Sequence, residues 1–161
     1  MFHSMISQFI SKGLIYTLVI LASANSLASS DTSDEVPLET REIRHMKFPK
    51  IVINEGTENG SYCVAKDIKN PPKSLCPNKK GRTAFIEVSG NTDTLVTVHP
   101  ASNEVTQNGI AFKLVSPSSN LNLGKSGKDK VEIAGQLKLV NKDSVQEGTL
   151  SFNYDVSVVY Q

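Results

Sequence analysis

The chain has 161 residues, with 17 basic and 16 acidic side chains and a formal net charge of +1. Such an even balance provides no long-range field that would favour nucleic acid or anionic lipid as a partner. The length is enough for one domain with its own core, but not comfortably for two.

The N-terminus has the pattern of a cleaved signal peptide. Lys12 precedes an apolar run at residues 13–22, and the small residues that follow include Ser26-Leu27-Ala28, which fits the small-x-small cleavage rule. We place the signal peptide at residues 1–28, with cleavage after Ala24 as the alternative. A membrane anchor is the other interpretation, but the run is shorter than the roughly 18 apolar residues of a spanning helix. No membrane span is therefore expected after cleavage.

Cleavage after Ala28 removes Lys12 and leaves 133 residues with 16 basic and 16 acidic side chains. The first part, residues 29–42, is small, polar and acidic, which predicts a flexible leader. Its only apolar residues up to Thr40 are Val36 and Leu38, which Pro37 separates. These two residues could also serve as a short donor segment. Residues 43–161 are predicted to form a single domain.

Cys63 and Cys76 lie on either side of a loop that contains Asn70-Pro71-Pro72. In an exported chain such a pair is normally a disulfide, and closing so short a loop contributes about 3 kcal/mol in the chain-entropy model. A metal site is the alternative. It would need further ligands, and the histidines after the signal peptide, His45 and His99, are distant in sequence.

The segments after the leader are almost all strand-like. A run at residues 82–88 and a run at residues 95–99 flank Ser89-Gly90-Asn91, which predicts a hairpin connection. About seven short strands separated by turn residues favour an all-β, immunoglobulin-like sandwich. The expected strands are residues 46–53, 61–65, 82–88, 95–99, 110–115, 131–140 and 149–161.

The closing segment is the most informative part of the chain. From residue 150 to residue 160, every second residue is apolar, and the residues between them are mostly Ser, Asn and Asp. Period two places all six apolar side chains on one face of a strand. They are Leu150, Phe152, Tyr154, Val156, Val158 and Tyr160. The last strand of any sandwich would alternate in the same way.

Two further features of this segment resemble the C-terminal signature of chaperone–usher fimbrial subunits. Gly148 is the fourteenth residue from the C-terminus, and Tyr160 is penultimate. The resemblance implies that the alternating strand pairs with an assembly chaperone, and that the glycine leaves room for a strand donated by a neighbouring subunit.

A second resemblance covers residues 46–161. The order of the segments is similar to that of a bacterial family of exported pilin-like domains of unknown function, which implies a fold and a location more than an activity. The matching residues are Phe85, Val88, Gly90, Gly135, Leu137, Gly148, Val156, Val158 and Tyr160. Two departures concern the fimbrial signature. The leader contains only Val36 and Leu38 in place of a long alternating donor strand, and the cysteines are closer together than in such subunits.

No catalytic or cofactor site is expected. The chain lacks a G-x-S-x-G elbow, and its two cysteines are expected to pair. The GKSGK sequence at residues 124–128 resembles part of a phosphate loop, but residue 119 is Ser where that motif needs Gly. His45 and His99 are interpreted as surface residues. Asp31, Asp34 and Glu35 could bind calcium weakly, but they are better explained as a solvated leader.

The sequence therefore predicts a structural or accessory subunit of a surface fimbria that supports adhesion or biofilm formation. It would pass through the periplasm to the cell surface, and its sandwich would be completed by a donated strand. Its partners would be other subunits or further copies of itself, with a periplasmic chaperone and an outer-membrane usher. The alternative is a self-contained immunoglobulin-like binding protein of the envelope.

Overall fold

The computed structural model describes residues 36–161, so the predicted signal peptide and residues 29–35 of the leader lie outside it. The described chain is all-β apart from one short 3-10 turn, η1 (Lys142–Ser144). Within this range, no helix is long and apolar enough to cross a membrane. The strands are β1 (Glu39–Arg44), β2 (Tyr62–Ala65), β3 (Ala84–Ser89), β4 (Leu95–Pro100), β5 (Val105–Gln107), β6 (Ile110–Leu114), β7 (Ser119–Asn122), β8 (Lys128–Ile133), β9 (Gly135–Leu139) and β10 (Val156–Tyr160).

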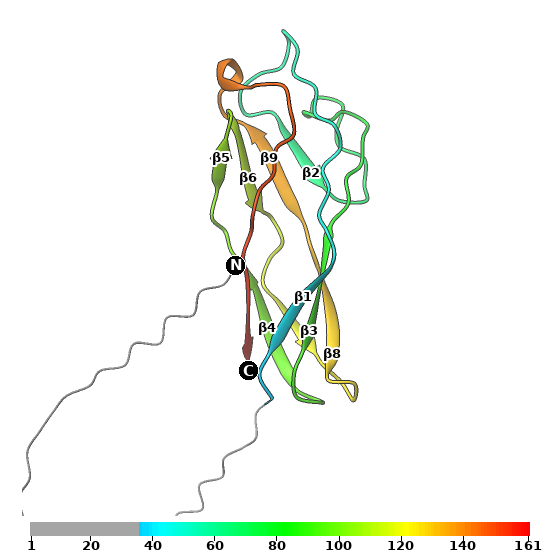
Figure 1. Cartoon of the computed structure of the whole chain (residues 1–161). Coiled ribbons are helices and arrows are strands. Elements are labelled where there is room, and N and C mark those ends of the chain that lie inside the picture. Colours follow the sequence, from blue (N-terminus) through cyan, green and yellow to red (C-terminus); the bar gives the residue numbers. More distant parts are fainter. Residues whose placement is uncertain (1–35) are drawn as a thin grey trace, which may run out of the picture. The chain divides into compact units, whose positions relative to one another are not determined.

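The strands form three antiparallel sheets, in the orders β1-β3-β8, β10-β4-β7 and β2-β9-β6-β5. Figure 1 shows the two three-stranded sheets in the lower half of the domain and the four-stranded sheet in the upper half. Only Ala134 separates β8 from β9, so one long run of chain serves the lower sheet and then the upper one. The all-β, sandwich-like fold expected from the sequence is confirmed.

The core follows from period-two alternation in the central strands. In β3, Ala84, Ile86 and Val88 are buried, while the residues between them are partly exposed. Val96 and Val98 of β4 are fully buried in the same cluster. Burying a side chain of this size stabilises the fold by about 1.5–3 kcal/mol relative to leaving it in water.

The predicted hairpin between the third and fourth expected strands is wrong. Strand β3 pairs with β1 and β8, whereas β4 pairs with β7 and β10, so the connection at Ser89-Gly90-Asn91 crosses between sheets. The physical reason is that both edges of β3 are already paired, with β1 on one side and β8 on the other, so no edge remains for β4.

The structure also differs from the expected strands at the two ends of the domain. Residues 39–42, assigned to the flexible leader, form most of β1, which pairs with β3. Residues 46–53 are extended but make only one isolated β-bridge, between Lys47 and Arg82. The last strand begins at Val156 rather than at residue 149. Three of the ten strands, β1, β5 and β7, were not expected at all.

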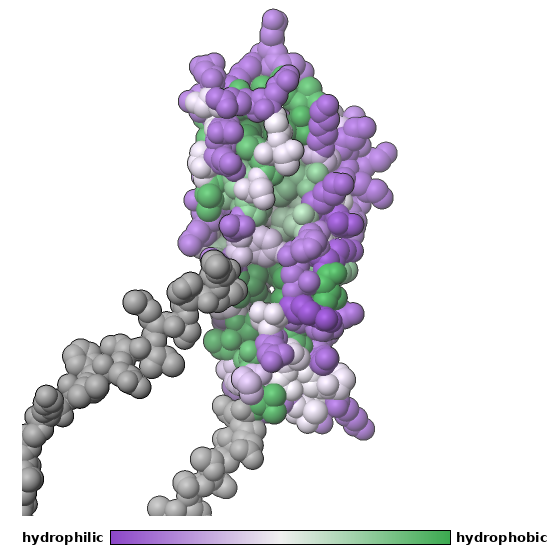
Figure 2. Space-filling view, in the orientation of Figure 1, coloured by the Kyte–Doolittle hydropathy of each residue, from purple (hydrophilic) through white to green (hydrophobic). Residues whose placement is uncertain are grey.

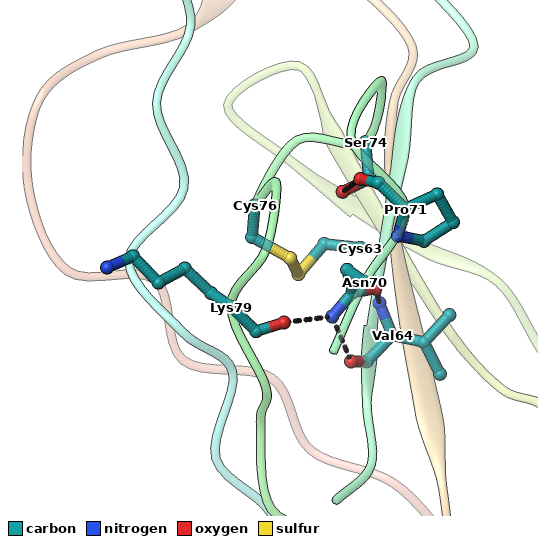
Figure 3. The surroundings of a disulfide bond; sticks show 7 residues. All are labelled: Cys63, Val64, Asn70, Pro71, Ser74, Cys76 and Lys79. Atoms are coloured by element: carbon teal, nitrogen blue, oxygen red, sulfur yellow. Dashed lines mark hydrogen bonds between the residues drawn. A yellow bond between two sulfur atoms is a disulfide. The ribbon is translucent and has the colours of Figure 1, made fainter. Parts of the chain in front are cut away.

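The cysteine loop, residues 66–82, is a well-anchored part of the upper half. Cys63 and Cys76 form the expected disulfide, and both are buried. Figure 3 shows Asn70 beside the disulfide, where its amide donates to the carbonyls of Val64 and Lys79, each at 3.0 Å. The Val64 amide in turn donates to Asn70 Oδ1 at 2.8 Å. The side chain of this buried asparagine therefore satisfies both backbone groups of Val64, and it adds a second hydrogen bond to the Lys79 carbonyl, which also accepts from the Asn70 backbone amide.

Candidate functional site: an unpaired seam between the two ends of the domain

The incompletely buried part of the core comes almost entirely from the two ends of the described chain. Thirteen partly buried apolar residues pack against the buried cluster, and only Leu121 lies outside the two terminal segments. Those of the N-terminal segment are Leu38, Met46, Phe48, Ile51 and Ile53. Those of the C-terminal segment are Val145, Leu150, Phe152, Tyr154, Val156, Val158 and Tyr160. These two segments are therefore where the core is least complete.

The two segments run antiparallel, and side chains connect them at three heights. Tyr160 Oη donates to the carbonyl of Val36 at 2.6 Å, and Tyr154 Oη donates to Glu42 Oε1 at 2.5 Å. At the far end, Lys142 Nζ donates to the carbonyl of Glu55 at 2.8 Å. We call the line between residues 36–55 and residues 142–160 the seam. Figure 1 shows both segments on one face, blue to cyan and orange to red.

No backbone hydrogen bond crosses the seam among residues 36–161. Furthermore, residues 146–154 make no backbone–backbone hydrogen bond to any part of the described chain. Neighbouring strands lie ~4.8 Å apart, so two segments that flank a missing strand are too far apart for their peptide groups to pair. Bridges made by long side chains, without a backbone ladder, are the arrangement expected on either side of such a gap.

Aromatic rings form the floor of the seam. Phe112 of β6 lies 6.0 Å from Phe48, edge to face, and stacks on Phe152 at 5.2 Å between centroids. The centroid of the Tyr154 ring, which belongs to the same segment as Phe152, lies 6.4 Å from that of Phe112. Phe112 is only 3% exposed because rings from both segments cover it. A hollow of about 60 Å³ beside these rings is lined by Phe112, by Tyr154 of the closing segment and by Val105 of β5.

The centre of the seam holds a short polar chain. Glu42 accepts from Tyr154 through one carboxylate oxygen and contacts His45 Nδ1 at 2.8 Å through the other. Burial raises the pKa of the Tyr154 phenol well above its ordinary value, and the hydrogen bond to Glu42 and the charge of that carboxylate raise it further. Tyr154 is therefore a neutral hydrogen-bond donor throughout the neutral pH range, which keeps this bridge across the seam intact.

The six alternating apolar residues of the closing segment lie as the sequence analysis expected. All six are partly buried and pack against the core, whereas Ser151, Asn153, Asp155 and Ser157 between them are exposed. Three of the six, Leu150, Phe152 and Tyr154, lie before β10, in the part without backbone partners. The alternation is thus present, but half of it belongs to an extended segment that no neighbouring strand holds.

Gly148 stands at the start of this segment. Its φ is +149°, a conformation that residues with a Cβ rarely adopt, and a Cβ built there would meet nothing within 4 Å. The described chain thus shows open space at this glycine rather than a close approach of backbone.

The two candidate donor residues contact their own domain. Leu38 packs against the core, and Val36 is 51% exposed while its amide donates to Asn91 Oδ1 at 3.0 Å. Asp31, Asp34 and Glu35 lie outside the described residues. His99 is exposed and hydrogen-bonds Ser118 Oγ at 3.0 Å, and the segment at residues 124–128 forms a turn that leads into β8.

The N-terminal half of the seam was not predicted from the sequence. Residues 46–53 were expected to form an ordinary strand, yet they lie beside the closing segment without a ladder. The apolar residues Met46, Phe48, Ile51 and Ile53 were visible in the sequence. Their alternation shifts by one residue after Pro49, and this pattern does not distinguish an unpaired segment from an ordinary short strand. Among residues 36–161, no group of three or more His, Cys, Asp or Glu side chains is placed to hold a metal ion.

A comparison with protein-family models finds no match, and searches of curated proteins and of solved structures likewise find no significantly similar protein. The seam itself is therefore the feature of this chain that bears on function.

Proposed function

We propose that the chain is a structural or accessory subunit of a bacterial surface fimbria, and that it receives a β-strand from another chain at the seam. The observation that carries the proposal is the closing segment at residues 146–154. It presents alternating apolar side chains to the core, but its peptide groups have no backbone partner within the described chain.

A donated strand would satisfy two needs of this segment at once. Unpaired peptide groups at a sheet edge invite pairing with another chain, and partly buried apolar side chains gain from further burial. A strand lying between residues 46–53 and residues 148–155 would supply backbone partners to both segments and would cover their apolar side chains. This is the β-strand addition mode of recognition, in which main-chain bonds provide affinity and alternate side chains provide specificity.

The setting proposed for this exchange is the bacterial envelope. The signal-peptide pattern of residues 1–28 and the disulfide between Cys63 and Cys76 both fit export into an oxidising compartment. A subunit with an open seam would need protection before assembly, which a periplasmic chaperone and an outer-membrane usher would supply. In the finished fimbria, other subunits or further copies of the chain would be its neighbours, and the fimbria would support adhesion or biofilm formation.

One observation favours the alternative of a self-contained immunoglobulin-like binding protein. Only 3% of Phe112 is exposed even without a donated strand, because Phe48 and Phe152 cover it from the two sides of the seam. A donated strand would have to move these rings apart. In the alternative, they close the sandwich permanently and no partner strand is needed.

A fusion experiment separates the two functions. A flexible linker and a nine-residue strand of alternating valine and threonine are added after Gln161 of the chain that begins at Ser29. If the seam receives a strand, the added segment pairs with residues 148–155 and buries its valines, which raises the unfolding midpoint by about 10 °C for a gain of 2–3 kcal/mol. Hydrogen exchange should slow at the amides of residues 146–154.

The matched control is a fusion with the same composition but with its valines in blocks, so that they cannot all face the core. The proposal predicts stabilisation by the alternating strand alone. Equal midpoints for the two fusions and for the unmodified chain, together with unchanged exchange at the amides of residues 146–154, would establish the closed sandwich instead.

A further inference from the structure

Although the net charge of the chain is close to zero, one part of its surface is strongly basic. Eight of the 16 basic residues that remain after Lys12 lie in the cysteine loop and at residues 47–50 beside it. All eight are exposed, and Asp67 is the only acidic residue between residues 66 and 82. We call them the basic surface: Lys47, Lys50, Lys66, Lys69, Lys73, Lys79, Lys80 and Arg82. Figure 2 shows hydrophilic residues gathered on the right of the upper half, where the cysteine loop lies in Figure 1.

Backbone contacts hold the two parts of this surface together. The Lys47 and Arg82 peptide groups exchange two hydrogen bonds of 2.8 Å, and the Val52 amide donates to the carbonyl of Leu75 at 3.2 Å. The Asn70 backbone amide donates to the carbonyl of Lys79 at 2.8 Å, which places the two halves of the loop side by side. None of the eight side chains forms an ion pair with any residue from 36 to 161.

The loop that carries these charges is held in place by buried groups. The disulfide, the Asn70 side chain and Leu75, which is fully buried, anchor it to β2 and to the core. A fixed array of like charges is under mutual repulsion, which the anchoring holds in check and which a polyanion would relieve. Because the backbone is already ordered, a ligand would not have to order it on binding.

We infer that the basic surface binds a linear acidic polysaccharide, a polymer with carboxylate or sulfate groups along its length. Seven of the eight residues are lysines, which act as hydrated point charges on flexible stems, and a polymer with repeated charges can contact several of them at once. Tyr62 is the one exposed aromatic side chain between residues 47 and 82, whereas proteins that bind single-stranded nucleic acid stack several bases on aromatic rings.

A lipid surface fits the same region less well. Val52 and Ile68 are exposed, but they stand singly among the lysines and do not form the continuous apolar face with which proteins insert into the interface of a bilayer. Binding a hydrated polymer with repeated negative charges requires only cations spaced along a surface, and the basic surface has them. This inference does not depend on strand donation at the seam.

The test measures binding of the mature chain to alginate, a linear polyuronate, over a series of salt concentrations. Binding should weaken steeply with salt because it releases counterions. The variant Lys69→Gln, Lys73→Gln, Lys80→Gln should bind on the order of tenfold more weakly and show a smaller salt slope. The matched control, Lys125→Gln, Lys128→Gln, Lys130→Gln, removes the same charge from the β7–β8 turn and the start of β8, and it should bind as the parent does.

Three results would overturn the inference: equal losses in the two variants, equal binding to the neutral polymer dextran, or tighter binding to double-stranded DNA or phosphatidylserine vesicles at the same salt. Unfolding midpoints of both variants check that the fold is retained. The strand fusion described above reports on the seam alone, so a failure of polysaccharide binding and a failure of strand donation are seen separately.

Discussion

Tyr160 and Val36 join the two ends of the described chain, because the tyrosine hydroxyl donates to the Val36 carbonyl at 2.6 Å across 124 sequence positions. The same hydroxyl accepts from the Asn91 amide at 3.1 Å. The penultimate tyrosine thus satisfies one backbone group from each of two other segments. It therefore has a structural role within the domain.

Gly90 provides the space for this arrangement, which leads to the first prediction. A Cβ at Gly90 would lie 2.6 Å from Tyr160 Oη and 2.8 Å from Leu38 Cδ2. Gly90→Ala should therefore displace the tyrosine and destabilise the domain by about 1–3 kcal/mol, as overpacking does. Gly56→Ala is the control, since its Cβ would meet only Asn54 Oδ1, at 3.6 Å. Urea unfolding measures both. Equal stability of the two variants would contradict the packing described here.

The second prediction concerns the bridge between Tyr154 and Glu42. Because the pKa of Tyr154 is raised in the folded chain, its contribution to stability is fully present below the ordinary tyrosine pKa of about 10 and is lost as the pH rises above it. The free energy of unfolding of the parent should fall between neutral pH and about pH 11. Tyr154→Phe should show a smaller fall. Lysine titration is common to both proteins, so the difference isolates Tyr154, and parallel curves would refute the bridge.

The third prediction concerns the anchor of the cysteine loop. Asn70→Ala leaves the buried amide and carbonyl of Val64 without their partner, so we expect a loss of about 2–4 kcal/mol. Asn78→Ala is the control, because its side chain is exposed and makes no hydrogen bond within the described residues. Its φ of 58° is one that alanine adopts less readily than asparagine, which costs about 1 kcal/mol. Denaturant titration should therefore separate the two variants by at least ~1 kcal/mol.

Much of the fold follows from the sequence because the central strands are amphipathic or wholly apolar. Residues 82–88, 95–99 and 110–115 predict β3, β4 and β6 to within two residues. Strand β1 could not be found in this way. All but the last of its residues are exposed, so Glu39–Arg44 shows no apolar period, and only its backbone bonds to β3 make it a strand.

Tertiary pairing was equally hidden from sequence reasoning. The alternation of Leu150, Phe152 and Tyr154 correctly predicts which face is apolar, but it cannot reveal that the peptide groups lack partners. The basic surface was missed for a different reason. In the net charge of the chain, lysines such as Lys66 and Lys80 are cancelled by acidic residues elsewhere. Only the fold shows that these cations are gathered at one end.

The fourth prediction concerns the stacking of Phe152 on Phe112. Full burial would make Phe152→Ala cost as much as 3–5 kcal/mol, but the side chain is only partly buried, so we expect about 1–3 kcal/mol. Ser151→Ala, one position away on the exposed face, should change stability by no more than about 0.5 kcal/mol. In the alternating-strand fusion the cost at Phe152 should increase, because the donated strand would complete its burial. An unchanged cost would mean that the fused strand does not cover this ring.

The last prediction separates two roles of Gly148. Its φ of +149° disfavours any residue with a Cβ, so Gly148→Ala should cost about 1–2 kcal/mol in the free chain although nothing lies within 4 Å. Gly124 is a matched control, because it also has a positive φ, +55°, and open space, but lies in the turn before β8.

If Gly148 leaves room for a donated strand, the two alanine variants should lose comparable stability as free chains, but only Gly148→Ala should lose the stabilisation that the alternating fusion provides. Gly124→Ala should keep that stabilisation in full, since a turn residue outside the seam does not meet the added strand. Thermal unfolding of the four proteins, each variant with and without the fused strand, decides the matter. The same gain on fusion in both variants would leave Gly148 with a backbone role alone, because a Cβ at its position would then not obstruct the donor.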